Sequence, residues 1–247
     1  MPRLVPFRPA AVCALALALL LPATALAAAK GTPAQLRVVA GQKVLADTTM
    51  RTGTTAVPTS RAADCFGNKD RGSGKAVRVA GATPLGLLVQ AARSNKALRP
   101  LLITDAFSFG LGLCAIGGLE PKGEGFWQLR VDHEAPELGG DAIELKRGDQ
   151  VLWYLTAGFP APEELWLKAP KQAKAGTPFR VRVFAYDEEG KRKPVAGVKV
   201  SGAKGPTSAK GLAAVTLGRP ARLIARHGKY IPSNRAAVCV GGKCPKG

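Results

Sequence analysis

Cysteine pairing is the covalent chemistry that this sequence offers most clearly. Four cysteines, Cys65, Cys114, Cys239 and Cys244, follow residue 29, and an even number in an oxidising compartment predicts two disulfides. Three pairings are formally possible. We favour Cys65–Cys114 and Cys239–Cys244, because each pair then lies within one expected domain. Neither pair has the two-residue separation of a zinc knuckle, so we expect no metal site.

Hydrolytic chemistry has little support in the residue pattern. A nucleophile needs a positioned base, but the sequence has no Gly-x-Ser-x-Gly elbow and only two histidines, His133 and His227. We expect His133 at the solvated tip of a hairpin and His227 in a basic loop. The pairs Glu163-Glu164 and Glu188-Glu189 fall in an expected linker and a turn, where solvation accounts for them. We therefore assign no catalytic residue and no cofactor.

Four aromatic residues on two expected strands are the candidates for ligand contact: Phe126, Trp127, Trp153 and Tyr154. Trp and Tyr combine a large contact area with a polar group. Strand alternation turns one ring of each adjacent pair toward the core and the other toward the opposite face of the sheet. Core packing is the default interpretation, and the outward ring of each pair is the better candidate for contact.

Basic residues recur at alternate positions of strands toward the C-terminus. Alternation places Arg180 and Arg182, and likewise Arg222 and Arg226, opposite the apolar residues of their strands, and Lys199 follows the same rule. We expect a cationic sheet face that attracts anionic cell-envelope polymers, with binding that weakens as salt rises. Specific nucleic-acid binding fits less well, because these strands carry few aromatic residues for base stacking. Solubility of an exported protein is the alternative explanation of the charge.

The first 29 residues have the pattern of an export signal. Arg3 and Arg8 precede an apolar run from residue 10 to 21, and small residues at 25–29 offer a cleavage site. We therefore expect a secreted or cell-envelope-associated protein that loses Cys13 with the signal. No later stretch approaches the roughly 20 apolar residues of a membrane span, so we expect no transmembrane segment after signal removal.

Composition divides the remaining chain in two. Residues 30–157 carry 16 basic and 12 acidic side chains, whereas residues 158–247 carry 18 and 5. Two prolines and a glycine interrupt the pattern at 158–164, where we place a linker. The sequence thus predicts one domain at 30–157 and a more basic one at 165–247.

The pattern within 30–157 predicts one helix and several strands. Thr83 is a suitable N-cap and Pro84 a suitable first residue for a helix with apolar residues at i, i+3, i+4 and i+7. A long aperiodic loop is expected from 48 to 81, tethered by Cys65. Glycines between 109 and 118 allow bends or close strand approach. Strands are expected in a hairpin over 35–46 and over 101–104, 126–131, 143–145 and 150–155.

The pattern beyond residue 164 is typical of a β-sandwich. Short apolar segments alternate with turns rich in Gly, Pro, Asn and Asp. Strands are expected over 165–167, 179–186, 195–200, 211–217, 221–225 and 236–240.

Three segments, 116–119, 125–132 and 145–154, together resemble a bacterial secreted domain related to the C-terminal domain of transcobalamin and intrinsic factor. The resemblance covers residues 34–157 and implies an α+β, β-grasp-like fold in which the helix lies across the sheet. Where the family usually has a Val-Asn-Gly turn, this chain has Val131-Asp132-His133. Transcobalamin relatives bind cobalamin against a large helical domain that this sequence lacks, so the resemblance does not imply the vitamin.

The C-terminal part is similar to the all-β, immunoglobulin-like or regulatory-type sandwiches of secreted bacterial proteins, through residues 197–200 and 208–213. Such sandwiches act as spacers or adhesive modules. The first functional hypothesis is a secreted, non-enzymatic protein that recognises a small ligand through the outward aromatic residues near Trp127 and Trp153. The alternative is an envelope-associated structural protein held by the charge of residues 165–235. An extracellular hydrolase is the third.

Overall fold

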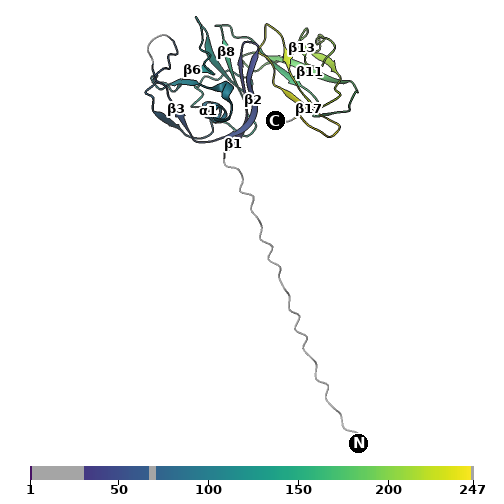
Figure 1. Ribbon diagram of the computed structural model, residues 1–247, viewed down its shortest axis with the longest axis horizontal. Helices are drawn as coiled ribbons and strands as arrows, with labels where there is room; N and C mark the ends of the chain where they lie inside the picture. The colour runs from purple at the N-terminus through teal and green to yellow at the C-terminus, as the bar shows by residue number, and fades with distance from the viewer. Residues whose placement is uncertain (2–30, 67–70, 246–247) are drawn as a thin grey trace.

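The computed structural model describes Met1 and residues 31–66 and 71–245 (Figure 1). The expected export signal, its cleavage site and Cys13 lie outside these residues. Most of the regular structure is β-strand, arranged in several sheets, with one α-helix in the described part of the chain. No helix there is long and apolar enough to cross a membrane.

Two hydrophobic cores form from separate stretches of the chain. The first uses residues between Ala34 and Trp153, and the second uses residues between Leu165 and Val240. A smaller cluster lies where the two parts meet, and it combines side chains from both. Its buried members are Val39, Val44, Leu152, Tyr154 and Ile231.

The N-terminal part of the described chain contains short strands around one α-helix and one 3-10 turn. These elements are β1 (Thr32–Ala40), β2 (Lys43–Thr52), β3 (Thr55–Pro58), β4 (Ala76–Val79), α1 (Pro84–Ser94), η1 (Lys96–Leu98), β5 (Leu101–Thr104), β6 (Gly112–Ile116), β7 (Phe126–Val131) and β8 (Gln150–Thr156).

A four-stranded sheet in the order β2-β1-β8-β7 is the centre of this part. β1 and β2 form an antiparallel hairpin that turns at Gly41, as predicted, where φ is 56°. β1 pairs with β8 in parallel, and β7 pairs with β8 antiparallel. Alternation sends Leu36 and Val38 into the core beneath α1 and turns Arg37 and Val39 to the other face. Both faces of the central sheet therefore carry side chains that other elements of the fold must shield from water.

The predicted helix is confirmed as α1, together with its start. Thr83 Oγ1 accepts a hydrogen bond from the Gly86 amide at 3.1 Å, and Pro84 is the first helical residue. The expected apolar stripe is buried, and so are neighbours outside it, because β3 covers the helix from a second side. The buried residues of the helix are Pro84, Leu85, Gly86, Leu87, Leu88, Val89, Ala91 and Ala92.

Two expectations for this part are wrong. The segment 48–81 was expected to lack strands, but β2 extends to Thr52 and the hairpin β3–β4 follows. Thr55 and Val57 alternate inward there over too few residues to stand out in the sequence. Residues 143–145 form no strand. Leu145 is nevertheless buried, and its amide donates to the Ala82 carbonyl at 2.7 Å. The apolar residue that suggested a strand is therefore packed against the core from a loop.

The C-terminal part is all β, in packed sheets around the second core. The main sheets are β12-β11-β14 with β9 added beside β11, and β10-β17-β15, with β13 and β16 as a separate pair. Each predicted segment contains a strand, although the segments at 195–200 and 221–225 are only partly regular. The strands are β9 (Glu164–Lys168), β10 (Gln172–Ala173), β11 (Phe179–Tyr186), β12 (Arg192–Pro194), β13 (Lys199–Val200), β14 (Leu212–Val215), β15 (Ala221–Leu223), β16 (Ala225–Arg226) and β17 (Ala236–Val240).

Both predicted disulfides are present. Cys65–Cys114 connects the segment between β3 and β4 to β6, across 49 residues of sequence. Cys239–Cys244 closes a turn after β17. The sulfurs therefore crosslink residues within each part of the chain, as expected.

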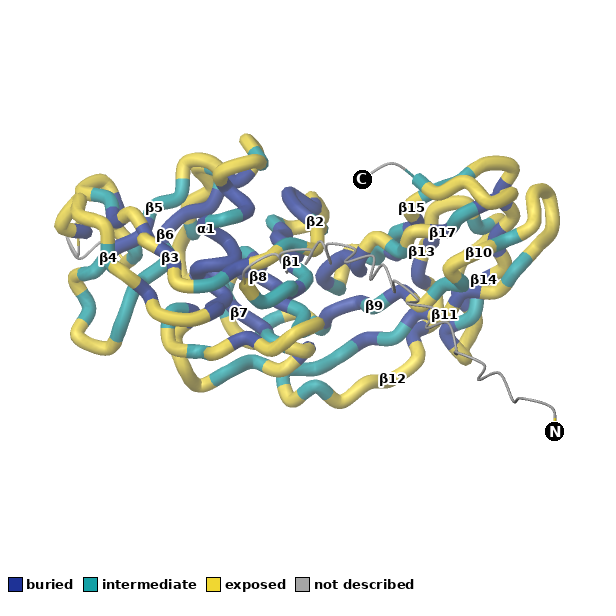
Figure 2. The backbone as a smooth tube through the Cα atoms, turned by 90° about the horizontal axis from the view of Figure 1, so that it is seen from below, coloured by how far each residue is buried: buried dark blue, intermediate teal, exposed yellow. Residues whose placement is uncertain are grey.

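The other face of the central sheet is covered by the C-terminal part, and β9 is the labelled strand of that part that lies nearest to it (Figure 2). The Ala135 amide donates to the Glu188 carbonyl at 2.9 Å, and Gln42 Nε2 donates to the Tyr230 carbonyl at 2.9 Å. These bonds lie at opposite ends of the junction. The two parts therefore meet through backbone and side-chain hydrogen bonds as well as apolar packing.

Candidate functional site

The structure separates the four aromatic candidates between the two faces of the central sheet. Trp127 and Trp153 point into the core beneath α1 and are 6% and 5% exposed. Tyr154 points to the opposite face and packs at the junction with the C-terminal part. Phe126 begins β7 and contacts Phe159, with ring centroids 4.9 Å apart. Of the two rings turned away from the core beneath α1, Tyr154 is covered by the C-terminal part and Phe126 is half-buried against Phe159.

Three of the four candidate residues, Phe126, Trp127 and Trp153, line an open pocket of about 360 Å³. Its lining contains no charged side chain, and it continues into a mouth of strongly exposed apolar residues. Phe66, Phe109 and Leu138 at this mouth are 61%, 80% and 61% exposed. The lining residues are Cys65, Phe66, Leu85, Phe107, Phe109, Leu111, Gly112, Leu113, Pro121, Phe126, Trp127, Gln128, Leu129, Ala135, Pro136, Leu138, Gly139, Gly140 and Trp153.

The rings at the mouth form a chain held by the first disulfide. Phe66 follows Cys65 and lies 5.9 Å from Phe107, which in turn stacks on Phe109 at 4.9 Å. Because Cys65 is bonded to β6, Phe66 is held beside the loop of Phe107 and Phe109, which is far from it in sequence. The outer two rings, Phe66 and Phe109, are strongly exposed and the middle one is partly buried. Exposed apolar rings gathered at the mouth of a pocket are typical of a binding site.

Glycines at two positions allow aromatic rings to lie against the backbone. A Cβ atom on Gly112 would lie 2.5 Å from the Phe107 ring. A Cβ atom on Gly140 would lie 2.7 Å from the Trp153 ring. Trp127 Nε1 donates to the Leu119 carbonyl at 3.0 Å, so the polar atom of this indole is already bonded and its ring offers apolar surface. The site can therefore bind neutral, apolar groups.

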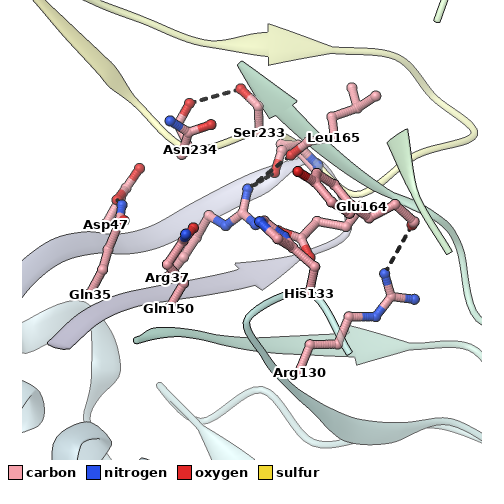
Figure 3. Close-up of polar contacts among 12 residues, drawn as sticks. Gln35, Arg37, Asp47, Arg130, His133, Gln150, Glu164, Leu165, Ser233 and Asn234 are labelled. Carbon is pink, nitrogen blue, oxygen red and sulfur yellow. Dashed lines mark hydrogen bonds and ion pairs between the residues drawn. The ribbon is translucent and has the colours of Figure 1, made fainter. Parts of the chain in front are cut away.

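A second set of polar residues lies on the other face of the sheet and is closed to solvent (Figure 3). Arg37 forms a buried ion pair with Glu164 and donates to the carbonyls of Leu165 and Pro232 at 3.2 and 2.9 Å. His133 Nδ1 lies 3.0 Å from the same Glu164 oxygen. These residues come from β1, β9 and the turn after β7, so they join the two parts of the chain.

The charge of Glu164 is stabilised by its neighbours. Burial is the largest single effect and disfavours the carboxylate, but Arg37 opposes it, with the hydrogen bond from His133 and the more distant Arg130 adding to the attraction. Together they hold the pKa of Glu164 below its ordinary value. The cavity beside this cluster measures about 10 Å³, close to the space of a single water molecule. A substrate therefore has no room at these groups.

The expectations for His133 and Glu164 are corrected by this cluster. His133 does lie at a hairpin tip, but it is 9% exposed, stacks on Tyr186 at 3.7 Å and meets the edge of Trp166 at 4.9 Å. Glu164, expected in a solvated linker, is 1% exposed and begins β9. Each of these residues is covered by the other part of the chain, and the local sequence gives no sign of that cover.

The five basic candidates do not share one surface. Arg180 and Arg182 lie on the outer side of β11, whereas Arg222 is exposed on β15 of the opposite sheet. Lys199 faces Arg226 across the β13–β16 pair, and Arg226 donates to the Gln42 carbonyl at the junction. The expected cationic face is thus divided among three places.

A smaller basic surface does form around Arg180 and Arg182. Lys168 and Arg192 join them on the β9-β11-β12 side, around a depression of about 480 Å³ that has no acidic residue in its lining. The Arg182 and Arg192 guanidinium groups lie 5.9 and 5.1 Å from the Phe184 ring centroid. We call these four basic residues and Phe184 the β11 basic surface.

Comparison with known proteins gives no assignment. No model of a known protein family matches the chain, and no curated protein matches it. Among the described residues, no group of three or more His, Cys, Asp or Glu side chains could hold a metal ion. The evidence on function therefore comes from the apolar pocket and the β11 basic surface.

Proposed function

We propose that this is a secreted binding protein whose N-terminal part recognises a small, neutral, largely apolar ligand in the pocket beside Trp127 and Trp153. The single observation that carries the proposal is the chain of three Phe rings, two of them strongly exposed, that leads into an uncharged pocket. A volume of about 360 Å³ is within the range of small-molecule sites. The two disulfides and the absence of a membrane-spanning helix among the described residues are compatible with export.

The β-grasp-like relationship is part of the same proposal. The parallel pair β1–β8 in the middle of the sheet, flanked by β2 and β7 and covered by α1, supports it. So does the turn at Asp132-His133, where φ is 50° and 77°. A two-residue hairpin turn with positive φ at both positions suits Asn-Gly, the pair that the transcobalamin-related family usually has there. The segments that carry the resemblance supply Phe126, Trp127 and Trp153 to the pocket.

A neutral fluorescent probe tests this proposal. N-phenyl-1-naphthylamine brightens in apolar surroundings, and we expect saturable binding to the full chain. Phe109→Ala removes an exposed ring of the mouth and should weaken binding about tenfold, while Phe184→Ala removes a partly exposed ring of the β11 basic surface, away from the pocket lining, and should change it far less. Equal affinity in both variants, or no saturable binding to the unaltered protein, would reject the apolar pocket as the site.

The β11 basic surface supports a second candidate function, adhesion to anionic cell-envelope polymers. Its four cations lie together on one side of one sheet, and none forms an ion pair within the described part of the chain. Charge of one sign on a concave surface attracts polyanions in a salt-dependent way. The two candidate functions use different parts of the molecule and can coexist.

A further inference from the structure

A wide groove lies beside the C-terminal half of α1, and the proposed ligand pocket does not include it. Its volume is about 1000 Å³, and it lies between the helix, the β3–β4 hairpin and the start of β5. Every side chain of its lining is either apolar or basic. The lining residues are Ala56, Pro58, Ala76, Val89, Ala92, Arg93, Lys96, Arg99, Pro100 and Leu101.

The basic residues of the groove are unpaired cations. Arg93, Lys96 and Arg99 are exposed, and none forms an ion pair within the described part of the chain. They recur every third residue along the end of α1 and the segment after it. Three cations with no acidic residue in the same lining favour a ligand with more than one negative charge.

The apolar residues of the groove are small and aliphatic. Val89 and Ala92 are buried within it, while Ala56, Pro58 and Ala76 are exposed along its side. No aromatic ring, hydroxyl or amide side chain is among them, so a sugar or a base would find neither stacking nor side-chain hydrogen bonds. An alkyl chain needs only aliphatic contact, and these residues supply it.

Two alternative occupants suit the groove less well. An extended peptide that adds a strand needs backbone N–H donors, and Pro58 on β3 and Pro100 before β5 have none. A bilayer surface is best bound by large protruding apolar side chains, whereas the exposed apolar residues here are only alanines and prolines. The shape and the charge together favour a single alkyl chain with an anionic head group.

We propose that this groove binds a single-chain amphiphile with a phosphate head group, the alkyl chain lying along Ala56, Val89 and Ala92 and the phosphate among Arg93, Lys96 and Arg99. A phosphate monoester carries about −1.5 to −2 charges at neutral pH, which suits three cations better than a carboxylate does. Arginine also binds phosphate oxygens through two parallel N–H bonds. The groove is separate from the apolar pocket. A failed binding test at one of these sites therefore leaves the proposal for the other unchanged.

Calorimetry with monododecyl phosphate, below its micelle concentration, tests the proposal on the full chain. We expect binding that is at least about tenfold weaker in Arg93→Glu/Arg99→Glu, because both arginines contact the head group. Ala56→Trp should weaken binding to a similar extent while leaving every charge in place, since Ala56 is exposed and a Trp there would fill the groove. Circular dichroism shows whether each variant is folded.

The matched control is Lys210→Glu/Arg219→Glu, which makes the same change of net charge at two exposed residues of the C-terminal part. This control should bind the amphiphile like the unaltered protein, and inorganic phosphate or decanol alone should bind far more weakly. No binding of monododecyl phosphate, unchanged binding by the folded Ala56→Trp variant, or an equal loss in the control would overturn the proposal. So would an acidic amphipathic peptide that binds the groove while monododecyl phosphate does not.

Discussion

Arg37 on β1 and Glu164 on β9 form a buried ion pair between residues 127 positions apart, and it connects the two parts of the molecule. Both side chains are almost fully covered, at 4% and 2% exposure. Nη1 of Arg37 donates to two carbonyls of the C-terminal part, those of Leu165 and Pro232. A pair of this kind stabilises the protein only while both partners are present, because a lone buried charge is costly.

Glu164→Gln should therefore destabilise the protein strongly, since it leaves the Arg37 charge buried without its partner. We expect a loss of about 3–5 kcal/mol in the free energy of unfolding, measured by urea titration at neutral pH. The control is Lys193→Gln, which breaks the solvent-exposed pair between Lys193 and Glu163 and should leave the urea midpoint almost unchanged. Similar midpoints for both variants would contradict the role given to the buried pair.

The same pair predicts how stability depends on acid. The pKa of Glu164 is lower in the folded protein than its ordinary value of 4.5, so its contribution is present above that value and is lost as the pH falls through the folded pKa. The urea midpoint of the unaltered protein should fall below about pH 4.5, and the difference from Glu164→Gln should shrink over the same range. A difference that stays constant down to pH 3 would show that Glu164 does not titrate in this way.

The disulfides should differ in their effect on stability and on binding. In a chain-entropy estimate, removing Cys65–Cys114, which spans 49 residues, costs roughly 4 kcal/mol, whereas removing Cys239–Cys244, which spans 5, costs roughly 2 kcal/mol. Double serine variants and thermal unfolding measure the two losses. Only loss of Cys65–Cys114 should also weaken binding of the naphthylamine probe, because Cys65 holds Phe66 at the pocket mouth. An equal loss of probe binding in both variants would show that Cys65–Cys114 has no specific role in holding the pocket mouth.

The β11 basic surface should determine binding to anionic polymers. Arg180→Glu/Arg182→Glu should elute from a heparin column at clearly lower salt than the unaltered protein. Arg219→Glu/Arg222→Glu changes the net charge equally but lies away from this surface, and it should elute closer to the unaltered protein. Equal shifts of both variants would show that net charge alone governs retention.

The sequence predicted the elements whose signals are local. Thr83 and Pro84 identified the start of α1, and Gly41 identified the turn of the first hairpin. Period-two alternation located β11 and β17 with their observed limits. These features depend on neighbouring residues alone, so one sequence is enough to find them.

What the sequence could not show is which element covers a given face. His133 has the local setting of an exposed turn, and it is buried only because Tyr186 and Trp166 of the C-terminal part lie against it. The pocket mouth has the same origin, since Phe66 and Phe109 are far apart in sequence and are brought near each other by Cys65–Cys114. The closely spaced rings of Phe107-Ser108-Phe109 were the one available signal, and the sequence does not show which way these rings point.

The two-sided cover of the β2-β1-β8-β7 sheet limits how this protein can be dissected. A fragment ending near residue 157 would expose Arg37, Leu152 and Tyr154 to water, together with the rest of a face shaped for β9 and β11. Such a fragment would self-associate or lose its shape before any ligand was added. Anyone wishing to transplant the ring-lined pocket to another scaffold must therefore move the C-terminal sandwich with it, or redesign that face as a solvent-compatible surface.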